Sequence, residues 1–287
     1  MYNLTDINVI KRIMSKNGFS FSKALGQNFI IDPGVCPLIV EKSGITEESG
    51  VLEIGPGVGV LTQEIGKKAK KVVALELDTR LIPVLADTLA DFDNIEVINA
   101  DVMKTDLQRI FEESFADCSD IHVCANLPYY ITSPIIMMLL ESRLPVKAIT
   151  VMVQKEAGER LCAEIGSRDA GAVSVAVNFY AEAQELFFVP RESFMPSPNV
   201  DSEVIKLTVR SEPEFKPTDE KFFFKVVKAA FSQRRKTAAN GLASGLGMPK
   251  DKIFEALENA SLDKNVRAEK LTMEEMYTLS EELYKLR

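Results

Sequence analysis

The sequence predicts an α/β fold with a seven-stranded sheet, followed by a small all-helical domain. Between residues 51 and 210, short apolar segments typical of buried strands alternate with segments of helical periodicity. The first strand leads into a glycine-rich loop that opens a helix, as at the start of a Rossmann-like unit. Residues 222–287 show no strand pattern. We therefore expect one domain over residues 1–210 and a second over residues 211–287, joined by the acidic, proline-containing segment 211–217.

The composition is typical of a folded protein that is not embedded in a membrane. Of the 287 residues, 46% are hydrophobic and 26% are charged. The apolar run Ile135–Leu140 is far shorter than the ~20 residues that span a bilayer. The first residues lack the basic and apolar regions of a signal peptide. We expect a cytoplasmic protein with no membrane partner.

The spacing of cysteines and histidines gives no sign of a metal site. The four cysteines are scattered without a Cys-x-x-Cys pair, and His122 is the only histidine. Buried thiols in a reducing compartment account for the cysteines. His122 lies within an apolar run, where a structural strand residue is the simpler interpretation. No metal is expected.

The chain is acidic overall but contains one basic segment. The net charge is −8 and the pI is about 5.0, which argues against a protein that coats nucleic acid indiscriminately. Residues 221–240 nevertheless contain six basic residues and no acidic one. Arg234, Arg235 and Lys236 form the densest part of this segment, either as a solvated face or, as we favour, as phosphate contacts of a local RNA-binding face.

The N-terminal region precedes the first predicted strand. Apolar residues at helical spacing predict a helix over residues 5–16, capped by Thr5 or Asp6. Gln27 and Asn28 follow, as turn formers or as ligands. Asp32 is a predicted N-cap with Pro33 at the first helical position, opening a helix that runs to about residue 43.

Polar residues follow the first three predicted strands. Strand 51–54 leads into Gly55-Pro56-Gly57-Val58-Gly59 and a helix over about 60–69. Strand 71–76 ends in Glu76, at the spacing from Gly55 typical of an acid that binds ribose hydroxyls. Strand 95–98 is followed by Asp101 and Val102, which suit an adenine amino group and ring. Because ligands of open α/β sheets bind at the carboxyl ends of the strands, these residues predict a nucleoside site.

The fourth strand, 121–125, delivers the segment Asn126-Leu127-Pro128-Tyr129-Tyr130. An amide oxygen, a rigid proline and a stacking ring suit an exocyclic amino group such as adenine N6. A helix over 132–142, a strand over 148–153 and helices over 155–165 and 171–180 should follow. Strands over 185–189 and 203–210, separated by a proline-rich loop, complete the sheet.

Two nucleoside cofactors are compatible with such a loop. A dinucleotide needs a pyrophosphate site at the helix N-terminus and the full glycine spacing, which the sequence lacks. S-adenosylmethionine needs only ribose and adenine contacts and space for its sulfonium. If the Asn126 side chain and the carbonyl of Leu127 or Pro128 both accept from adenine N6, the nitrogen lone pair is freed for methyl transfer, and positioning supplies most of the catalysis. An adenine within a helix would have to be flipped out.

These motifs together resemble the small-subunit ribosomal RNA adenine N6,N6-dimethyltransferases, the KsgA/RsmA family. The resemblance covers nearly the whole chain. The matching segments are Gly26-Gln27-Asn28-Phe29-Ile30, Glu53 to Thr62, Glu76-Leu77-Asp78, Ala100-Asp101, Asn126 to Tyr130, Phe194-x-Pro196-x-Pro198-x-Val200-Asp201-Ser202 and Phe231 to Thr237. Ala157 stands where the family usually has valine, and residues 237–240 lack a basic residue often seen there, which puts some RNA contact in doubt.

The resemblance implies a seven-stranded methyltransferase domain that uses S-adenosylmethionine, plus a helical RNA- or ribosome-binding domain. It implies two methyl groups on each of two adjacent adenosines, in a hairpin loop near the 3′ end of 16S rRNA within an assembling 30S subunit. Tyr129 and Phe194 would enclose the flipped adenine, beside Asn126, Leu127 and Pro128. We expect a monomer that does not act on DNA. The expected cofactor contacts are Gln27, Asn28, Ile30, Gly55, Gly57, Glu76, Asp101, Val102 and Asn126.

Three alternatives remain open. A related group methylates a large-subunit rRNA adenine and confers macrolide resistance, but its members tend to be strongly basic. A non-catalytic ribosome-assembly factor could keep the fold. The motif residues that argue against this are all intact, namely Glu76, Asp101, Asn126 and Tyr129. A DNA adenine methyltransferase is disfavoured because Leu127 stands where those enzymes have proline.

Overall fold

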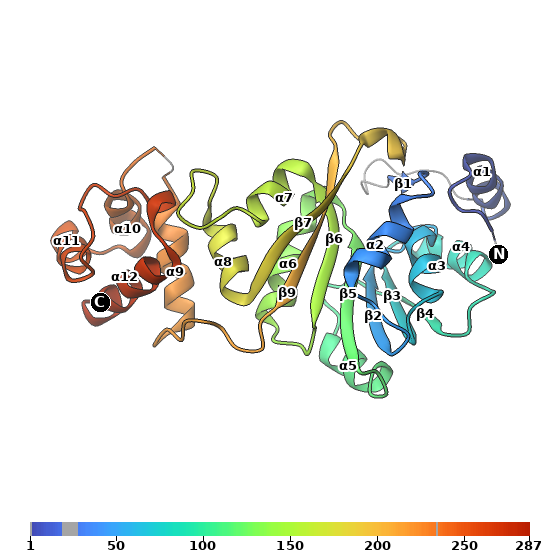
Figure 1. Cartoon of the computed structure of the whole chain (residues 1–287), viewed down its shortest axis with the longest axis horizontal. Helices are drawn as coiled ribbons and strands as arrows, with labels where there is room; N and C mark the ends of the chain where they lie inside the picture. The colour runs from blue at the N-terminus through green and yellow to red at the C-terminus, as the bar shows by residue number, and fades with distance from the viewer. Residues whose placement is uncertain (1, 19–27, 234) are drawn as a thin grey trace. The chain divides into compact units, whose positions relative to one another are not determined.

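The computed structural model describes residues 2–18, 28–233 and 235–287 (Figure 1). Its contacts divide the chain into two compact units. The first contains residues up to Gly158 together with Ala183–Val209, and the second contains Glu159–Glu182 together with Arg210–Arg287. The chain therefore passes from the first unit to the second twice.

A seven-stranded sheet forms the first unit, in the order β4-β3-β2-β5-β6-β9-β7. The pairs β4–β3, β3–β2, β2–β5 and β5–β6 are parallel, and β9 is antiparallel to β6. All seven predicted strands are confirmed. They are β2 (Ser49–Ile54), β3 (Lys71–Glu76), β4 (Ile95–Asn99), β5 (Asp120–Asn126), β6 (Ala148–Gln154), β7 (Ala181–Val189) and β9 (Ser202–Val209).

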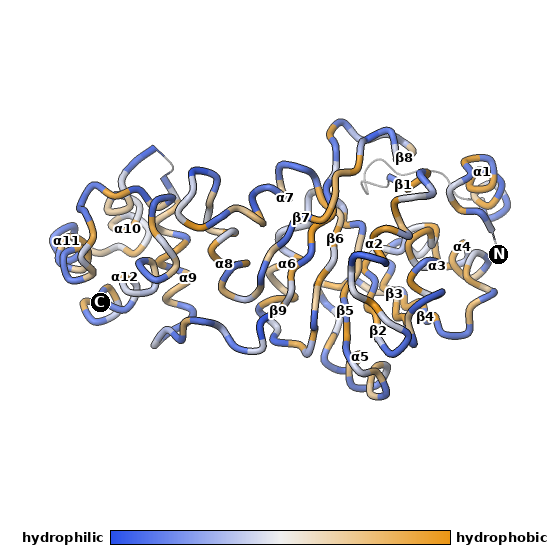
Figure 2. Tube along the Cα trace, in the orientation of Figure 1, coloured by the Kyte–Doolittle hydropathy of each residue, from blue (hydrophilic) through white to orange (hydrophobic). Residues whose placement is uncertain are grey.

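The central strands contain long hydrophobic stretches (Figure 2). Every residue of β2 is buried, as are all residues of β6 except the last. A continuous apolar run is what a parallel strand covered on both faces requires. The strand order reverses between β2 and β5, because the chain builds β3 and β4 on one side and then returns to the other. Such a switch point leaves a crevice at the carboxyl ends of the strands.

Seven α-helices lie along the described residues of this part of the chain, and their bounds refine three predictions. Asp6 is confirmed as the cap of α1, since its side chain accepts from the Asn8 N–H. Helix α2 begins at Val35 rather than Pro33, because the Asp32 carboxylate accepts from the Gly34 N–H in a turn that delays the helix. The helices are α1 (Ile7–Lys16), α2 (Val35–Ser43), α3 (Val60–Gly66), α4 (Ile82–Thr88), α5 (Leu107–Ser114), α6 (Thr132–Glu141) and α7 (Lys155–Leu161).

Helix α7 is shorter than the predicted 155–165. The carbonyl of Arg160 accepts from the Ser174 hydroxyl at 2.6 Å instead of continuing the helix. Downstream, Gly166 takes a left-handed φ of +90° that reverses the chain.

A second, two-stranded sheet was not predicted. Strand β1 (Phe29–Ile30) pairs antiparallel with β8 (Phe194–Met195), so Ile30 lies opposite Phe194. The Ile31 N–H extends the pairing by donating to the Ser193 carbonyl at 2.8 Å. This small sheet attaches the loop before α2 to the loop between β7 and β9.

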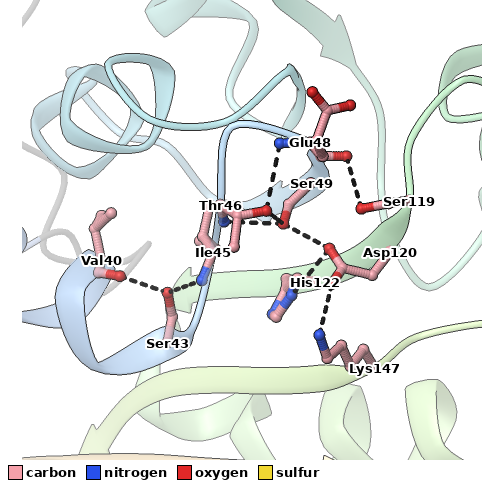
Figure 3. Close-up of polar contacts among 10 residues, drawn as sticks. All are labelled: Val40, Ser43, Ile45, Thr46, Glu48, Ser49, Ser119, Asp120, His122 and Lys147. Atoms are coloured by element: carbon pink, nitrogen blue, oxygen red, sulfur yellow. Dashed lines mark hydrogen bonds and ion pairs between the residues drawn. The ribbon is translucent and has the colours of Figure 1, made fainter.

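The amino ends of β2 and β5 are joined by polar contacts (Figure 3). Asp120 accepts from the Ser49 hydroxyl at 2.5 Å and from the Lys147 ammonium at 2.6 Å. His122 lies beside them, fully buried, with Nε2 3.4 Å from the Asp120 carboxylate. Burial lowers the pKa of His122, and Lys147 and Lys206 lower it further against the opposing effect of Asp120. His122 is therefore a structural residue at the edge opposite the crevice.

The second unit is helical among the residues described. It contains α8 (Ala172–Tyr180), α9 (Glu220–Ala230), α10 (Ala238–Leu246), α11 (Lys250–Asn259) and α12 (Met273–Lys285). Phe179 of α8 packs against Phe223 and Phe224 of α9, with ring centroids 5.4 and 5.2 Å apart. These contacts group residues 159–182 with the C-terminal helices, whereas the sequence alone assigned them to the first domain.

Among the described residues, no helix is long and apolar enough to cross a membrane.

Candidate active site

A cavity of about 1230 Å³, counting its open mouth, lies at the carboxyl ends of β2, β3, β4 and β5. Its place at the strand ends is where open α/β sheets bind ligands. Most of the predicted site residues line it, from five separate segments of the first unit. These are Asn28, Ile30, Gly55, Gly57, Glu76, Asp101, Val102, Asn126, Leu127 and Pro128.

The glycine loop brings the backbone to the cavity wall. Gly55, Gly57 and Gly59 all adopt a left-handed φ, between +61° and +93°, which side chains with a Cβ rarely tolerate. At Gly57 a Cβ would also lie 3.2 Å from the ring of Phe29. Glycine is thus required here by conformation and, at Gly57, by close packing.

Glu76 presents a carboxylate at the end of β3. One of its oxygens accepts from the Gly57 N–H at 3.2 Å and the other from the Asp78 N–H at 2.8 Å. Burial raises the pKa of Glu76, while these backbone N–H groups oppose the shift. A carboxylate has about four acceptor positions, so Glu76 can still accept from a ligand hydroxyl beside these backbone contacts.

Asp101 and Val102 form the wall beyond β4. The Asp101 carboxylate accepts from the Met103 N–H at 3.0 Å, and its other oxygen lies 3.4 Å from the Lys104 ammonium. Val102 is buried at 8% exposure yet lines the cavity. An acceptor beside an apolar side chain suits the edge and face of a purine.

Asn126 lies at the end of β5 with its amide oriented. Its Nδ2 donates to the Asn28 carbonyl at 3.5 Å, a contact that uses the amide N–H and not Oδ1. The Pro128 carbonyl already accepts from the Ile131 N–H and the Thr132 hydroxyl, at 3.1 and 3.3 Å. Of the two carbonyls that we considered as acceptors, the one of Leu127 is therefore better placed to receive a further donor.

Sequence reasoning missed Glu53 as a cavity residue. It lies within β2, is 1% exposed and lines the cavity. Burial raises its pKa to about 8, with Glu76 adding to the shift and the nearby Thr62 hydroxyl opposing it. One of its oxygens has no hydrogen-bond partner among the described residues. Its position between apolar strand residues was the available signal, since a charged residue there must be buried.

The apolar part of the wall was missed as well. Strand and loop residues of ordinary hydrophobic type build it, and nothing in their identity separates them from the core. Two of these residues line the cavity while remaining largely exposed, Tyr130 at 67% and Leu77 at 58%. The other apolar lining residues include Phe29, Ile54, Leu61, Leu75, Ile131 and Ile135.

The remaining predicted residues lie elsewhere or outside the described part of the chain. Phe194 is buried at 3% exposure in β8, opposite Ile30, and does not line the cavity. Gln27 and Arg234 lie outside the described residues, as does the side chain of Tyr129. Arg235 and Lys236 are exposed in the segment between α9 and α10 of the second unit.

Comparison with known proteins places this geometry in context. The model of the family described as "Ribosomal RNA adenine dimethylase" matches residues 18–285. The chain is 50% identical over 276 residues to Ribosomal RNA small subunit methyltransferase A of Bacillus licheniformis, covering 95% of this chain and 94% of that protein. It is 49% identical over 286 residues to the protein of the same name from Bacillus mycoides, covering 99% and 98%.

Two solved structures share the fold. A dimethyladenosine transferase from Plasmodium falciparum is 27% identical with a TM-score of 0.73, over 87% of this chain and 95% of that one. The 23S rRNA methyltransferase ErmE is 26% identical with a TM-score of 0.68, over 90% and 100%. These matches, together with the seven-stranded sheet, confirm the predicted methyltransferase fold.

Proposed function

The chain belongs to the ribosomal RNA adenine dimethylase family, and from this premise we propose that it transfers methyl groups from S-adenosylmethionine to N6 of two adjacent adenosines in 16S rRNA. The adenosines would be those of a hairpin loop near the 3′ end, reached while the small subunit assembles. Membership makes the chain a methyltransferase. We propose the identity of the methyl donor, of the two target adenosines and of the ribosomal subunit that contains them.

The cavity residues suit S-adenosylmethionine. Glu76 presents a carboxylate at the end of β3 that can accept from ribose hydroxyls. Asp101 and Val102 offer an acceptor and an apolar contact for adenine. The glycine loop lets the backbone approach without side chains intervening. When bound, the cofactor would supply an electrophilic methyl group on a sulfonium.

Asn126 carries the proposal for the methyl acceptor. With its amide held by the Asn28 carbonyl, Oδ1 can accept one N6–H of a target adenine. The Leu127 carbonyl can accept the second. Two acceptors on one amino group orient the nitrogen lone pair away from both, toward the methyl donor. The N6–methyl bond would form as the sulfonium–methyl bond breaks, and the N6 proton would leave to solvent after transfer. Rate enhancement then comes from positioning and electrostatics, without a strong general base.

The second unit supplies charge for the RNA backbone. Lys221, Lys225 and Lys228 lie at helical spacing on α9 and are all exposed. The basic loop that follows α9 contains Arg235 and Lys236, also exposed. A local basic face of this kind supports phosphate contact in an otherwise acidic protein. We further propose that the enzyme acts as a cytoplasmic monomer.

Methyl transfer to ribosomal subunits tests this proposal. Labelled S-adenosylmethionine would be incubated with small subunits that lack the modification, with large subunits as a control and Asn126→Ala as the inactive variant. We expect label near four methyl groups per small subunit, and its loss in the variant. Because Asn126 is also an expected cofactor contact, binding of S-adenosylmethionine by the variant, measured by calorimetry, would separate loss of the cofactor from loss of methyl transfer alone.

Other outcomes identify the alternatives. Label confined to large-subunit RNA would replace the proposal with the activity that the name of ErmE describes. Absence of label on both subunits, combined with tight binding to small subunits, would indicate an assembly factor without catalysis.

A further inference from the structure

Exposed hydrophobic side chains are concentrated at one edge of the sheet. Six large hydrophobic residues are exposed among the residues that the structure describes, and five of them lie at the carboxyl edge of the parallel strands. Only Tyr2 lies elsewhere. The five are Leu77 after β3, Met103 after β4, Tyr130 after β5, Phe188 at the end of β7 and Val200 before the antiparallel β9. Apolar groups gathered on one surface mark a site of interaction.

Contacts near β6 show that Phe188 and Val200 share this edge with Tyr130. The first residue of β9 pairs with the last of β6, since Ser202 lies opposite Gln154. Asp201 accepts from the Arg191 N–H at 3.0 Å, and its carbonyl accepts from the Lys155 N–H at 3.0 Å. The segment after β7, the segment before β9 and the end of β6 therefore meet at one place.

The five residues form two groups. Leu77 and Met103 lie on the side of the cavity that suits the cofactor, near Glu76 and Asp101. Tyr130, Lys155, Phe188 and Val200 lie on the other side, and we call these four the stacking edge. The Lys155 ammonium lies over the ring of Phe188, 5.7 Å from its centroid. Tyr130 and Phe188 are 67% and 49% exposed. Because Lys155 lies over one face of the Phe188 ring, a planar partner of Phe188 would take the other face.

We propose that the stacking edge binds the single-stranded RNA nucleotides that flank the target adenine. This inference rests on the proposed function. A base that enters the cavity beside Asn126 must leave its stack. The bases on either side of it then lose a stacking partner, and a protein surface can replace that contact. Proteins hold unpaired nucleotides on exposed aromatic rings with cations near the backbone. Tyr130 lies at the cavity mouth, where it would stack on one neighbouring base. Phe188 and Lys155 lie further along the edge and would contact another.

The strand order sets the separation of the two rings. Tyr130 follows β5 and Phe188 ends β7, which are three strand spacings apart in the order β5-β6-β9-β7. At about 4.8 Å per spacing, the two positions are about 14 Å apart along the sheet. The rings therefore serve different bases, and the chain between them passes Lys155.

Fluorescence of a short RNA tests the stacking directly. The probe is a single-stranded RNA hexamer with 2-aminopurine beside a single adenine, whose emission falls when the base stacks on an aromatic ring. We expect Phe188→Ala and Tyr130→Ala in the full chain to weaken binding by about tenfold and to reduce the quenching. Phe188→Tyr should retain both. Tyr2→Ala removes an exposed ring away from this edge and is the matched control.

Three outcomes separate this inference from the proposed function. If the wild type methylates small subunits but the Phe188 and Tyr130 variants bind the hexamer like Tyr2→Ala, the stacking edge is wrong and the function stands. If the variants lose hexamer binding but the wild type methylates no small subunit, the edge stands and the function fails. If Phe188→Ala weakens binding to small subunits but not to the hexamer, the edge contacts ribosomal protein and the RNA assignment is overturned.

Discussion

Glu53 and Glu76 are two carboxyl groups of the same cavity; burial raises the pKa of both, but they differ in their hydrogen bonds. Glu76 accepts from two backbone N–H groups, which favour its charged form. Glu53 is held within β2, where burial raises its pKa to about 8 and leaves one oxygen unpaired among the described residues. At neutral pH, Glu53 is therefore largely protonated in the folded protein without cofactor.

Replacing Glu53 by glutamine should stabilise the cofactor-free protein in a pH-dependent way. Unfolded Glu53 loses its proton above about pH 4.5, whereas folded Glu53 keeps it until about pH 8. The free energy of unfolding of the wild type should thus fall relative to Glu53→Gln between these values, by a few kcal/mol at most. Below pH 4.5 the difference should be flat. Urea unfolding from pH 4.5 to 8 measures this effect.

Glu185→Gln, at an exposed position of β7, is the control for the change of side chain. A constant difference between wild type and Glu53→Gln across this pH range would mean that Glu53 is charged throughout.

The role of a single residue could be predicted where a sequence motif fixes its position. It could not be predicted where burial in the fold decides its protonation or its contacts. Glu76 could be assigned because its distance from Gly55 along the chain is characteristic. Glu53 could not, since its altered chemistry depends on neighbours from other strands. Phe194 was assigned to the base through the resemblance, yet it is buried in β8 in this structure, so its role stays a prediction.

At the level of elements, α9 and α10 approach closely through small residues. A Cβ at Gly241 would lie 2.4 Å from the Ala229 carbonyl oxygen, and one at Gly245 would lie 2.6 Å from the Ala229 Cβ. Both glycines are helical, so their replacement by alanine would normally favour the helix. Here the close packing should dominate.

Gly241→Ala should therefore destabilise the second unit by about 1–3 kcal/mol. Ser244→Ala, at an exposed position on the same helix, is the control and should be neutral or stabilising. Thermal unfolding followed by circular dichroism distinguishes the two. A Gly241→Ala protein as stable as Ser244→Ala would show that the two helices can separate at no cost.

Elements with a periodic pattern were predicted well, and short or strained ones were not. The seven strands follow from apolar runs, and α8 was identified as a helix despite its valines. Strands β1 and β8 have two residues each and pair across most of the first unit, so no local pattern reveals them. The start of α2 was misplaced because the turn at Asp32 and Gly34 competes with the helix.

At the scale of the whole molecule, charge is distributed unevenly between an acidic chain and the basic segment of the second unit. Neutralising Arg234, Arg235 and Lys236 together should weaken RNA binding and flatten its dependence on salt. The slope of log K against the logarithm of the salt concentration is negative. It should become shallower by about 0.7 to 0.9 for each phosphate that the variant no longer neutralises. Filter binding to small-subunit RNA over a range of salt concentrations measures the slope.

Neutralising Lys11, Lys42 and Lys68, which are exposed on the first unit, removes the same charge elsewhere and is the control. An equal change of slope in both triple variants would assign the effect to net charge, and an unchanged slope in the first would remove the cluster from the interface.

The domain boundary shows what composition can and cannot supply. The proline-containing segment 211–217 was visible as a linker, and residues 211–219 indeed form no helix or strand. The assignment of residues 159–182 depends on Phe179 packing against Phe223, a contact between distant segments. The division into functional domains at residue 210 therefore stays a prediction.

The position of β9 has a consequence for synthesis. Strand β9 is the last of the sheet to leave the ribosome, but it lies between β6 and β7, which are made before it. Until residue 209 has emerged, β6 keeps an open edge and β7 has no partner in the sheet. We expect a nascent chain that stalls before β9 to bind chaperones and to pair with other chains. Once β9 has emerged, the chain can complete its own sheet.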